Sequence, residues 1–259
     1  MGNLSIIGRK FYGISITGLG FLTIYYADFP YMLIPPRHSW IPGLAMISYA
    51  FGIMFILAGA CIILEKKVRT VSLLLATVLL LIFCFYFLPY QLAVSRRFIQ
   101  LGYWENAEKE LALSAGAFVI AGCFPGKNEN TFIRFLAKLI PLGSILFAIT
   151  ILSFGIDHFL YAKEAAGYVP SWIPNHLFWI YFAGIALIGS GISILLRIRV
   201  RLIATLLGTM IFIWFIILHV PYVIAAHFAD TGGEVTSAFL ALAYAGIAFV
   251  IASNAKKDS

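Results

Sequence analysis

Apolar residues occur in eight long runs along the chain, separated by short segments that contain charged residues, prolines or glycines. The runs are near the length of about 20 residues that an α-helix needs to cross a bilayer. Backbone amides in lipid must be hydrogen-bonded within the segment, and the runs lack the two-residue alternation of a barrel strand, so we expect helices. The expected spans are residues 11–28, 43–64, 70–94, 108–124, 135–160, 174–196, 202–226 and 234–252.

The middle of the chain contains an internal repeat. Shifting the sequence against itself aligns Ser39-Trp40-Ile41-Pro42 with Ser171-Trp172-Ile173-Pro174, and we call this shift, from Ser39 to Ser171, the repeat offset. The match continues without a gap, and nineteen of the fifty-two positions from 39 to 90 are identical. Shared apolar composition explains paired leucines, but it does not explain paired Trp, Pro, Gly and Arg, so the repeat indicates a duplication.

The repeat predicts the architecture. We expect an all-α membrane fold of eight transmembrane helices made of two four-helix repeats, residues 1–126 and 135–259, joined by a cytoplasmic linker at 127–134. Four spans is an even number, so the two copies should lie parallel about an axis along the membrane normal. The repeated prolines Pro89 and Pro221 should kink the third and seventh spans near their outer ends.

Composition and charge support this assignment and predict the orientation. Hydrophobic residues make up 62% of the chain and charged residues 11%, whereas a soluble domain has about 25% charged residues. Thirteen of the eighteen Lys and Arg lie in the termini or in the segments after the second, fourth and sixth spans. The positive-inside rule then places both termini in the cytoplasm, as in a multi-pass protein of the inner membrane. We expect lipid and not nucleic acid as partner, because the basic residues form no stripe with interleaved aromatics.

The residues with acid–base chemistry gather on the outer side. All five histidines map there, and Asp157-His158 lies at the outer end of the fifth span while His219 lies two residues before Pro221. An imidazole beside a carboxylate passes protons near neutral pH, so Asp157, His158 and His219 are the candidate catalytic residues. The alternative is plain interfacial hydrogen bonding, since ionisable groups at helix ends cost little.

Further side chains on the outer side are candidates for binding a substrate. They are Trp172, Tyr222, His176, Arg96, Arg97 and Arg37. The aromatic members are placed to flank a flat ring, and the arginines either attract an anion or are solvated loop residues. No ligand spacing matches a zinc site, so no metal is expected. The loops 28–42 and 161–174 are short, apolar and contain prolines, so we expect them to fold back over the outer face.

Two strings in the second repeat resemble the DoxX-like family of multi-span membrane proteins. They are Ser153-Phe154-Gly155-Ile156-Asp157-His158-Phe159 and Val169-Pro170-Ser171-Trp172-Ile173-Pro174, followed by Phe182-Ala183-Gly184. Family members are typically four-span units, so the resemblance implies a fused pair over most of the chain. It also implies a component of a quinone-linked or sulfur-linked redox system, with other membrane or periplasmic redox subunits as partners. The first copy has Ala27-Asp28-Phe29 in place of Asp-His-Phe, so a site is expected in the second copy only.

Three functions remain open at this point. The first is a redox component, an oxidoreductase subunit that binds quinone at the outer face. The second is a transporter of small solutes or lipids, although the span interiors show neither the buried charges nor the broken helices that transporters usually have. The third is a non-catalytic membrane scaffold. No dinucleotide-binding or haem-attachment motif is present, so the residues alone name no cofactor.

Overall fold

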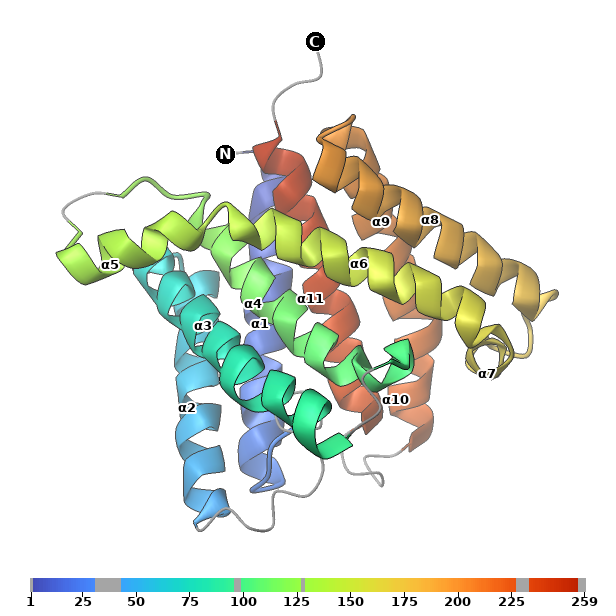
Figure 1. The fold of residues 1–259 in the computed structure, drawn as a ribbon, viewed down its shortest axis with the longest axis horizontal. Helices are drawn as coiled ribbons and strands as arrows, with labels where there is room; N and C mark the ends of the chain where they lie inside the picture. Colours follow the sequence, from blue (N-terminus) through green and yellow to red (C-terminus); the bar gives the residue numbers. More distant parts are fainter. Residues whose placement is uncertain (1, 31–42, 96–98, 127–128, 227–232, 256–259) are drawn as a thin grey trace.

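The computed structural model describes residues 2–30, 43–95, 99–126, 129–226 and 233–255, and every regular element in these ranges is helical (Figure 1). The long α-helices are α1 (Asn3–Tyr25), α2 (Leu44–Ile63), α3 (Val68–Ile82), α4 (Glu105–Ala121), α6 (Leu142–Leu160), α8 (His176–Leu196), α9 (Val200–Trp214) and α11 (Gly233–Asn254). The shorter ones are α5 (Thr131–Leu136), α7 (Ala162–Ala166) and α10 (Val220–Ala226). Three π-helices, Phe83–Phe87, Tyr90–Ser95 and Phe215–His219, and two 3-10 turns, Leu101–Tyr103 and Ala137–Leu139, complete the list.

Six of the described helices are long and apolar enough to cross a membrane, so the chain is a multi-pass membrane protein in contact with lipid. They are Leu44–Ile63, Val68–Ala93, Thr131–Leu160, His176–Leu196, Val200–Ala226 and Gly233–Asn254. The prediction of eight spans is thereby confirmed for six. The other two expected spans are helical but less apolar: α1 is rich in Gly, Ser and Thr and carries Arg9 and Lys10, and α4 has 17 residues with four charged ones near its start. A crossing by α1 and α4 stays a prediction.

Helices α4 and α11 lie at the centre of the bundle (Figure 1). Every residue of α4 from Glu110 to Ala121 is buried, and so is nearly all of α11. Alanine and glycine are frequent in both helices, and small side chains let helix backbones approach closely in lipid. Helix α1 packs on α2 and α11, while α6 packs on α8 and α4. The residue ranges 1–126 and 135–259 therefore share one core, because the first long helix of each range packs on the last helix of the other.

Backbone features recur between the two ranges at the repeat offset found in the sequence. Helices α3 and α9 begin and end at matching positions, and so do the π-helices Phe83–Phe87 and Phe215–His219 that continue them. The left-handed residues Gly43, Glu65 and Lys67 recur at the same offset as Asn175, Arg197 and Arg199. Each of these two π-helices ends two residues before a proline, Pro89 or Pro221. The distortion expected at these prolines thus includes a widened turn, which accompanies the loss of a regular backbone hydrogen bond.

Close contacts between helix backbones also recur. Glycines let the backbones of these helix pairs approach closely. A Cβ added to the glycine would meet a backbone carbonyl of the facing helix at four positions between α1 and α2, and at three positions between α6 and α8. The contacts are Gly13–Gly59 and Gly20–Gly52 in the first pair of helices, and Ala148–Gly191 and Gly155–Gly184 in the second. The repeat offset relates α2 to α8, whereas a slightly larger shift, which takes both Gly13 to Ala148 and Gly20 to Gly155, relates α1 to α6.

The expected cytoplasmic segments meet at one end of the bundle. Arg9 of α1 pairs with Glu65 in the turn after α2 at 2.9 Å, and Asn254 in the last turn of α11 donates to Cys123 after α4 at 3.3 Å. Helix α1 begins and helix α11 ends at this end (Figure 1). This arrangement agrees with an even number of passes, and the identity of the membrane and the side that faces the cytoplasm stay predictions.

In the segment 127–134, expected as a linker, the described residues 131–134 are helical. Asn130 caps α5 by accepting a hydrogen bond from the backbone amide of Ile133 at 2.8 Å, and α5 begins at Thr131. Asparagine is a preferred N-cap because its side-chain oxygen satisfies an amide that the helix leaves free. The helix that follows the linker therefore begins earlier than the expected residue 135.

Candidate functional site

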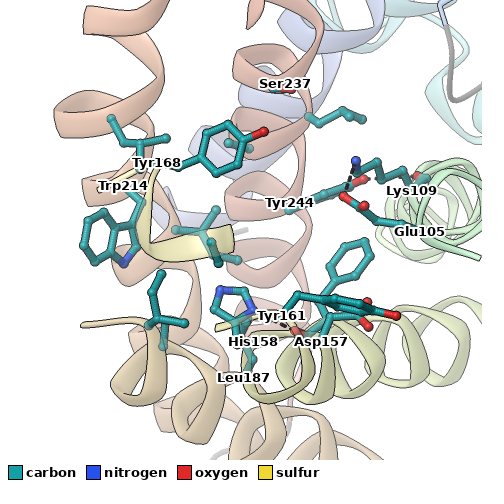
Figure 2. Close-up of a pocket in the computed structure, with 18 of the residues that line it drawn as sticks. Glu105, Lys109, Asp157, His158, Tyr161, Tyr168, Leu187, Trp214, Ser237 and Tyr244 are labelled. Atoms are coloured by element: carbon teal, nitrogen blue, oxygen red, sulfur yellow. Dashed lines mark hydrogen bonds and ion pairs between the residues drawn. The ribbon is translucent and has the colours of Figure 1, made fainter. Parts of the chain in front are cut away.

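A cavity of about 950 Å³ lies among α4, α6, α8, α9, α11 and the segment that contains α7. Its volume is in the range of sites for small organic ligands. Aromatic and aliphatic side chains make up most of its wall, including Phe154, Trp179, Trp214 and Tyr244. Figure 2 shows Trp214 and Tyr168 facing Glu105 and Lys109 across the cavity.

The three candidate catalytic residues line this cavity together. Asp157 and His158 come from the last turn of α6, and His219 from the π-helix that follows α9. Both carboxylate oxygens of Asp157 and Nδ1 of His219 are buried and have no hydrogen-bond partner. Sequence separation between 158 and 219 hid this proximity, which depends on how α6 and α9 pack around α8.

The tautomer of His158 follows from its contact with the backbone. Its Nδ1 lies 2.7 Å from the carbonyl oxygen of Phe154. A carbonyl only accepts, so Nδ1 carries the hydrogen and donates it. In the neutral ring Nε2 is then an acceptor, and His158 is one of the residues that line the cavity. The backbone of α6 thus orients one imidazole of the site.

Charged residues of α4 supply the opposite wall of the cavity, and the sequence alone did not place them in the site. Glu105 pairs with Lys109 at 2.5 Å across one turn of the helix (Figure 2). Ser153 of α6 donates to Oε1 of Glu108 at 2.6 Å, while Oε2 of Glu108 is buried without a partner. The available signal was the cluster of charges at the mouth of the fourth expected span. A contribution of α4 to the site was not expected.

The candidate binding residues that the structure describes, Trp172, His176 and Tyr222, do not line the cavity. Trp172 is 70% exposed, and neither it nor His176 is among the lining residues. Tyr222 does not line the cavity either, but its hydroxyl donates to the carbonyl oxygen of Tyr168 at 3.2 Å, and Tyr168 is a lining residue. The aromatic walls come instead from Trp179 and Trp214. The arginines Arg37, Arg96 and Arg97 lie outside the described residues.

The segment from Tyr161 to Val169 folds back over the cavity, as expected for the loop 161–174. Tyr161, Glu164, Tyr168 and Val169 all line it. The hydroxyl of Tyr161 accepts a hydrogen bond from the backbone amide of Gly102 at 3.3 Å, which ties this segment to the turn before α4. This segment of the second half of the chain therefore covers part of the cavity.

Glu110 corrects the expectation that the span interiors contain no buried charged residue. Its side chain is fully buried in the second turn of α4, and neither carboxylate oxygen has a hydrogen-bond partner. The sequence placed it at the mouth of a span beside Glu108 and Lys109. Helix α4 lies at the centre of the bundle, however, so a side chain that faces away from the cavity is enclosed by neighbouring helices.

No three His, Cys, Asp or Glu side chains gather as a metal site within the described ranges. Compared with models of known protein families, with curated proteins and with solved structures, the chain gives no match. The resemblance to the DoxX-like family therefore rests on the sequence strings alone, and activity must be argued from the cavity.

Proposed function

We propose that this membrane protein binds a quinone in the cavity between α4, α6 and α9, as a subunit of a membrane redox system. The observation that carries the proposal is that Asp157, His158 and His219 line one cavity whose walls are otherwise largely apolar and aromatic. A quinone has the matching form, since it joins a flat ring with two polar oxygens to an apolar tail.

The polar side chains suit the proton chemistry of such a ring. Reduction of a quinone to a quinol takes up two electrons and two protons, and each ring oxygen gains one proton. A carboxylate and two imidazoles beside the ring are groups that exchange protons near neutral pH. Trp179 and Trp214 provide aromatic faces for the ring. The electron donor belongs to a partner subunit in this proposal, and we place that partner on the outer, periplasmic side.

We further propose that the chain arose by duplication, and that only the second copy kept a cavity. At the repeat offset His219 corresponds to Phe87, which is 1% exposed. At the shift that relates α1 to α6, which takes Gly20 to Gly155, Asp157 corresponds to Leu22 and not to Ala27, with which the sequence strings alone had matched it. Apolar residues thus occupy the first-copy positions of both side chains.

Close glycine contacts also relate the helix pair α6–α4 to the helix pair α1–α11. Helix α6 meets α4 at Gly143 and Ala115, and helix α1 meets α11 at Gly8 and Gly246, so Ala115 of α4 corresponds to Gly246 of α11. The shift that takes Ala115 to Gly246 also takes Glu108 to Phe239, and the shift that takes Gly8 to Gly143 also takes Gly18 of α1 to Ser153 of α6. The ring of Phe239 lies against Gly18, where the second copy has the hydrogen bond of Ser153 to Glu108. This asymmetry favours a binding site over interfacial hydrogen bonding, because helix-end chemistry alone would act alike in both copies.

The test is to purify the protein in native lipid nanodiscs and to identify co-purifying small molecules by mass spectrometry. We expect a quinone at near one molecule per chain, and its loss in His158→Ala and His219→Phe. The matched control is His176→Gln, which changes a histidine outside the cavity and should retain the ligand. Bulk phospholipid as the only small molecule, with added short-chain quinone also failing to bind, would overturn the proposal and favour a transporter or a scaffold.

A further inference from the structure

The turn between α8 and α9 carries three arginines that alternate with apolar residues. From position 196 the sequence reads Leu-Arg-Ile-Arg-Val-Arg-Leu, and we call its residues 197–201 the arginine turn. The arginines are all exposed, and they are Arg197, Arg199 and Arg201. The exposed apolar neighbours are Leu196, Ile198 and Leu202. Because α8 ends at Leu196 and α9 begins at Val200, only three residues join two membrane-spanning helices, and the turn stays at the membrane interface.

The acidic residues at this end of the bundle pair with arginines of the first half of the chain. Glu65 pairs with Arg9 at 2.9 Å, and Glu129 pairs with Arg69 at 2.6 Å. No other acidic residue of the described ranges lies at this end, and no guanidinium of the arginine turn forms an ion pair within those ranges. Like charges this close in the chain repel one another, so an anion bound from outside would stabilise them.

The first copy has a turn of the same backbone shape but a different balance of charge. At the repeat offset Arg197 corresponds to Glu65, and both residues are left-handed. Glu65 pairs with Arg9 of α1, whereas the shift that relates α1 to α6 takes Arg9 to Ser144. The second copy therefore has a cation where the first has an ion-paired acid, and no ion pair within the described residues accounts for that cation.

The backbone of the arginine turn is fixed by its own hydrogen bonds. The amide of Ile198 donates to the carbonyl oxygen of Ser193 at 2.9 Å, and the hydroxyl of Ser193 donates to the carbonyl oxygen of Ile198 at 2.5 Å. The amide of Arg197 donates to the carbonyl oxygen of Ile194 at 3.3 Å. The arginines thus project from a preorganised turn, which reduces the entropy that is lost when a ligand binds.

From these observations we infer that the arginine turn binds the phosphate of an anionic phospholipid. A guanidinium matches a phosphate through two parallel N–H···O hydrogen bonds. Arginine extends its apolar stem along the helix end and keeps its charge among the headgroups, while the exposed side chains of Leu196, Ile198 and Leu202 contact acyl chains. A phospholipid joins these two parts in the same order, whereas a soluble phosphate would leave the apolar side chains uncovered. The inference is independent of the quinone proposal.

The expected effect follows from the charges. Each Lys or Arg near an anionic lipid surface contributes about fivefold in affinity. Arg197→Gln combined with Arg199→Gln should therefore weaken the binding of phosphatidylglycerol by about 25-fold. The matched control is Lys66→Gln combined with Lys67→Gln, which removes two exposed cations from the turn between α2 and α3. That turn lies on the other side of α1 and α11 (Figure 1), where salt screens its charges from the arginine turn, so the control should weaken binding by less than about threefold.

The experiment titrates the full-length protein in a neutral detergent with phosphatidylglycerol and counts the bound lipid by native mass spectrometry. Two further probes separate the parts of the ligand: phosphatidylcholine with the same acyl chains, and glycerophosphoglycerol, which is the headgroup without chains. We expect phosphatidylglycerol to bind at least about tenfold more tightly than either. Arg197→Lys combined with Arg199→Lys keeps the charge but not the paired hydrogen bonds, so its affinity should lie between those of the wild type and the glutamine variant.

Three results would overturn the inference. Equal affinities for phosphatidylglycerol and phosphatidylcholine would show that the arginines select no anion. Equal losses for the arginine and the lysine double variants would show a diffuse attraction to this end of the bundle in place of a site. Binding of glycerophosphoglycerol as tight as that of the lipid would assign the turn to a soluble anion. Thermal unfolding in the same detergent checks the fold of each variant, and if the glutamine variant is unfolded, the charge-conserving variant and the three probes on the wild type decide the question.

Discussion

Arg69 is expected to be the most important charged residue for stability at the end of the bundle where α1 begins and α11 ends. Its Nε pairs with Glu129 at 2.6 Å, and Nη1 donates to the carbonyl oxygens of Ala121 and Phe124 at 3.2 and 2.8 Å. Ala121 is the last residue of α4 and Phe124 follows it, and apart from Arg69 the carbonyl of Ala121 accepts from the backbone amide of Phe124 at 3.3 Å. One guanidinium thus joins the start of α3, the end of α4 and the segment before α5.

The cost of Arg69→Ala follows from these contacts. The side chains of Arg69 and Glu129 are 19% and 12% exposed, so the pair is mostly shielded from water. Removing one member of a buried ion pair costs about 3–5 kcal/mol, because the other charge is left without a partner. With partial exposure we expect the lower end, about 3 kcal/mol. For a chain of this length that corresponds to a fall of roughly 6–12 °C in Tm.

The chain offers a matched control for this variant. Arg201 occupies the corresponding position of the second repeat at the start of α9, but it is exposed and makes no ion pair within the described residues. Arg201→Ala should therefore change the free energy of unfolding by no more than about 0.5 kcal/mol. The assay is thermal unfolding of both variants in the same detergent. Equal shifts for the two arginines, or a shift for Arg69→Ala within the error of the wild type, would refute the reasoning.

Three further predictions use the same preparation or intact cells. Glu110→Met should raise the free energy of unfolding by about 1–3 kcal/mol, because it removes a buried carboxyl without a partner at similar volume; a lower Tm would show that the carboxyl is satisfied in the membrane. Gly191→Ala should lower the free energy of unfolding by about 1–3 kcal/mol, since the new Cβ would lie 2.8 Å from a backbone carbonyl of α6. Gly189→Ala in the same helix meets nothing within 4 Å and should leave this free energy unchanged. Equal melting curves for the two variants would contradict the close contact. In a cysteine-free background, a membrane-impermeant maleimide added to intact cells should label Lys163→Cys and not Lys66→Cys, and the reverse pattern would invert the orientation.

The sequence predicted the helices better than their surroundings. Apolar runs bounded by charges locate a span within a few residues, because lipid requires that length. The same criterion describes α1 and α4 less well. These helices face other helices more than lipid, so glycine, serine and charged residues are tolerated there. The full burial of Glu110 follows from that central position, which no local pattern reveals.

The sequence predicted only part of the site, because local patterns do not reveal how the helices pack. Asp157, His158 and His219 stand out because an acid and two imidazoles near a proline are rare in apolar runs. Trp172 stood out as a repeated residue, but it lies before α8 begins, whereas Trp179 lies in α8 and lines the cavity. Which residues of α8 face inward depends on the rotation of the helix against α6 and α9. The contribution of α4 required the packing of residue ranges that are distant in the chain.

That contribution explains why the two halves of the chain are not independent units. Helix α4 belongs to the first half by sequence, but Glu105 and Lys109 form a wall of the cavity beside α6. Helix α11 occupies the corresponding place beside α1, and there Phe239 fills the space over Gly18. A single four-helix unit would have to obtain its fourth helix from a second copy to complete such a cavity. In the proposed duplication, fusion of two copies would allow the two inner helices to diverge, one to keep charges at a cavity and the other to close its counterpart with an aromatic ring.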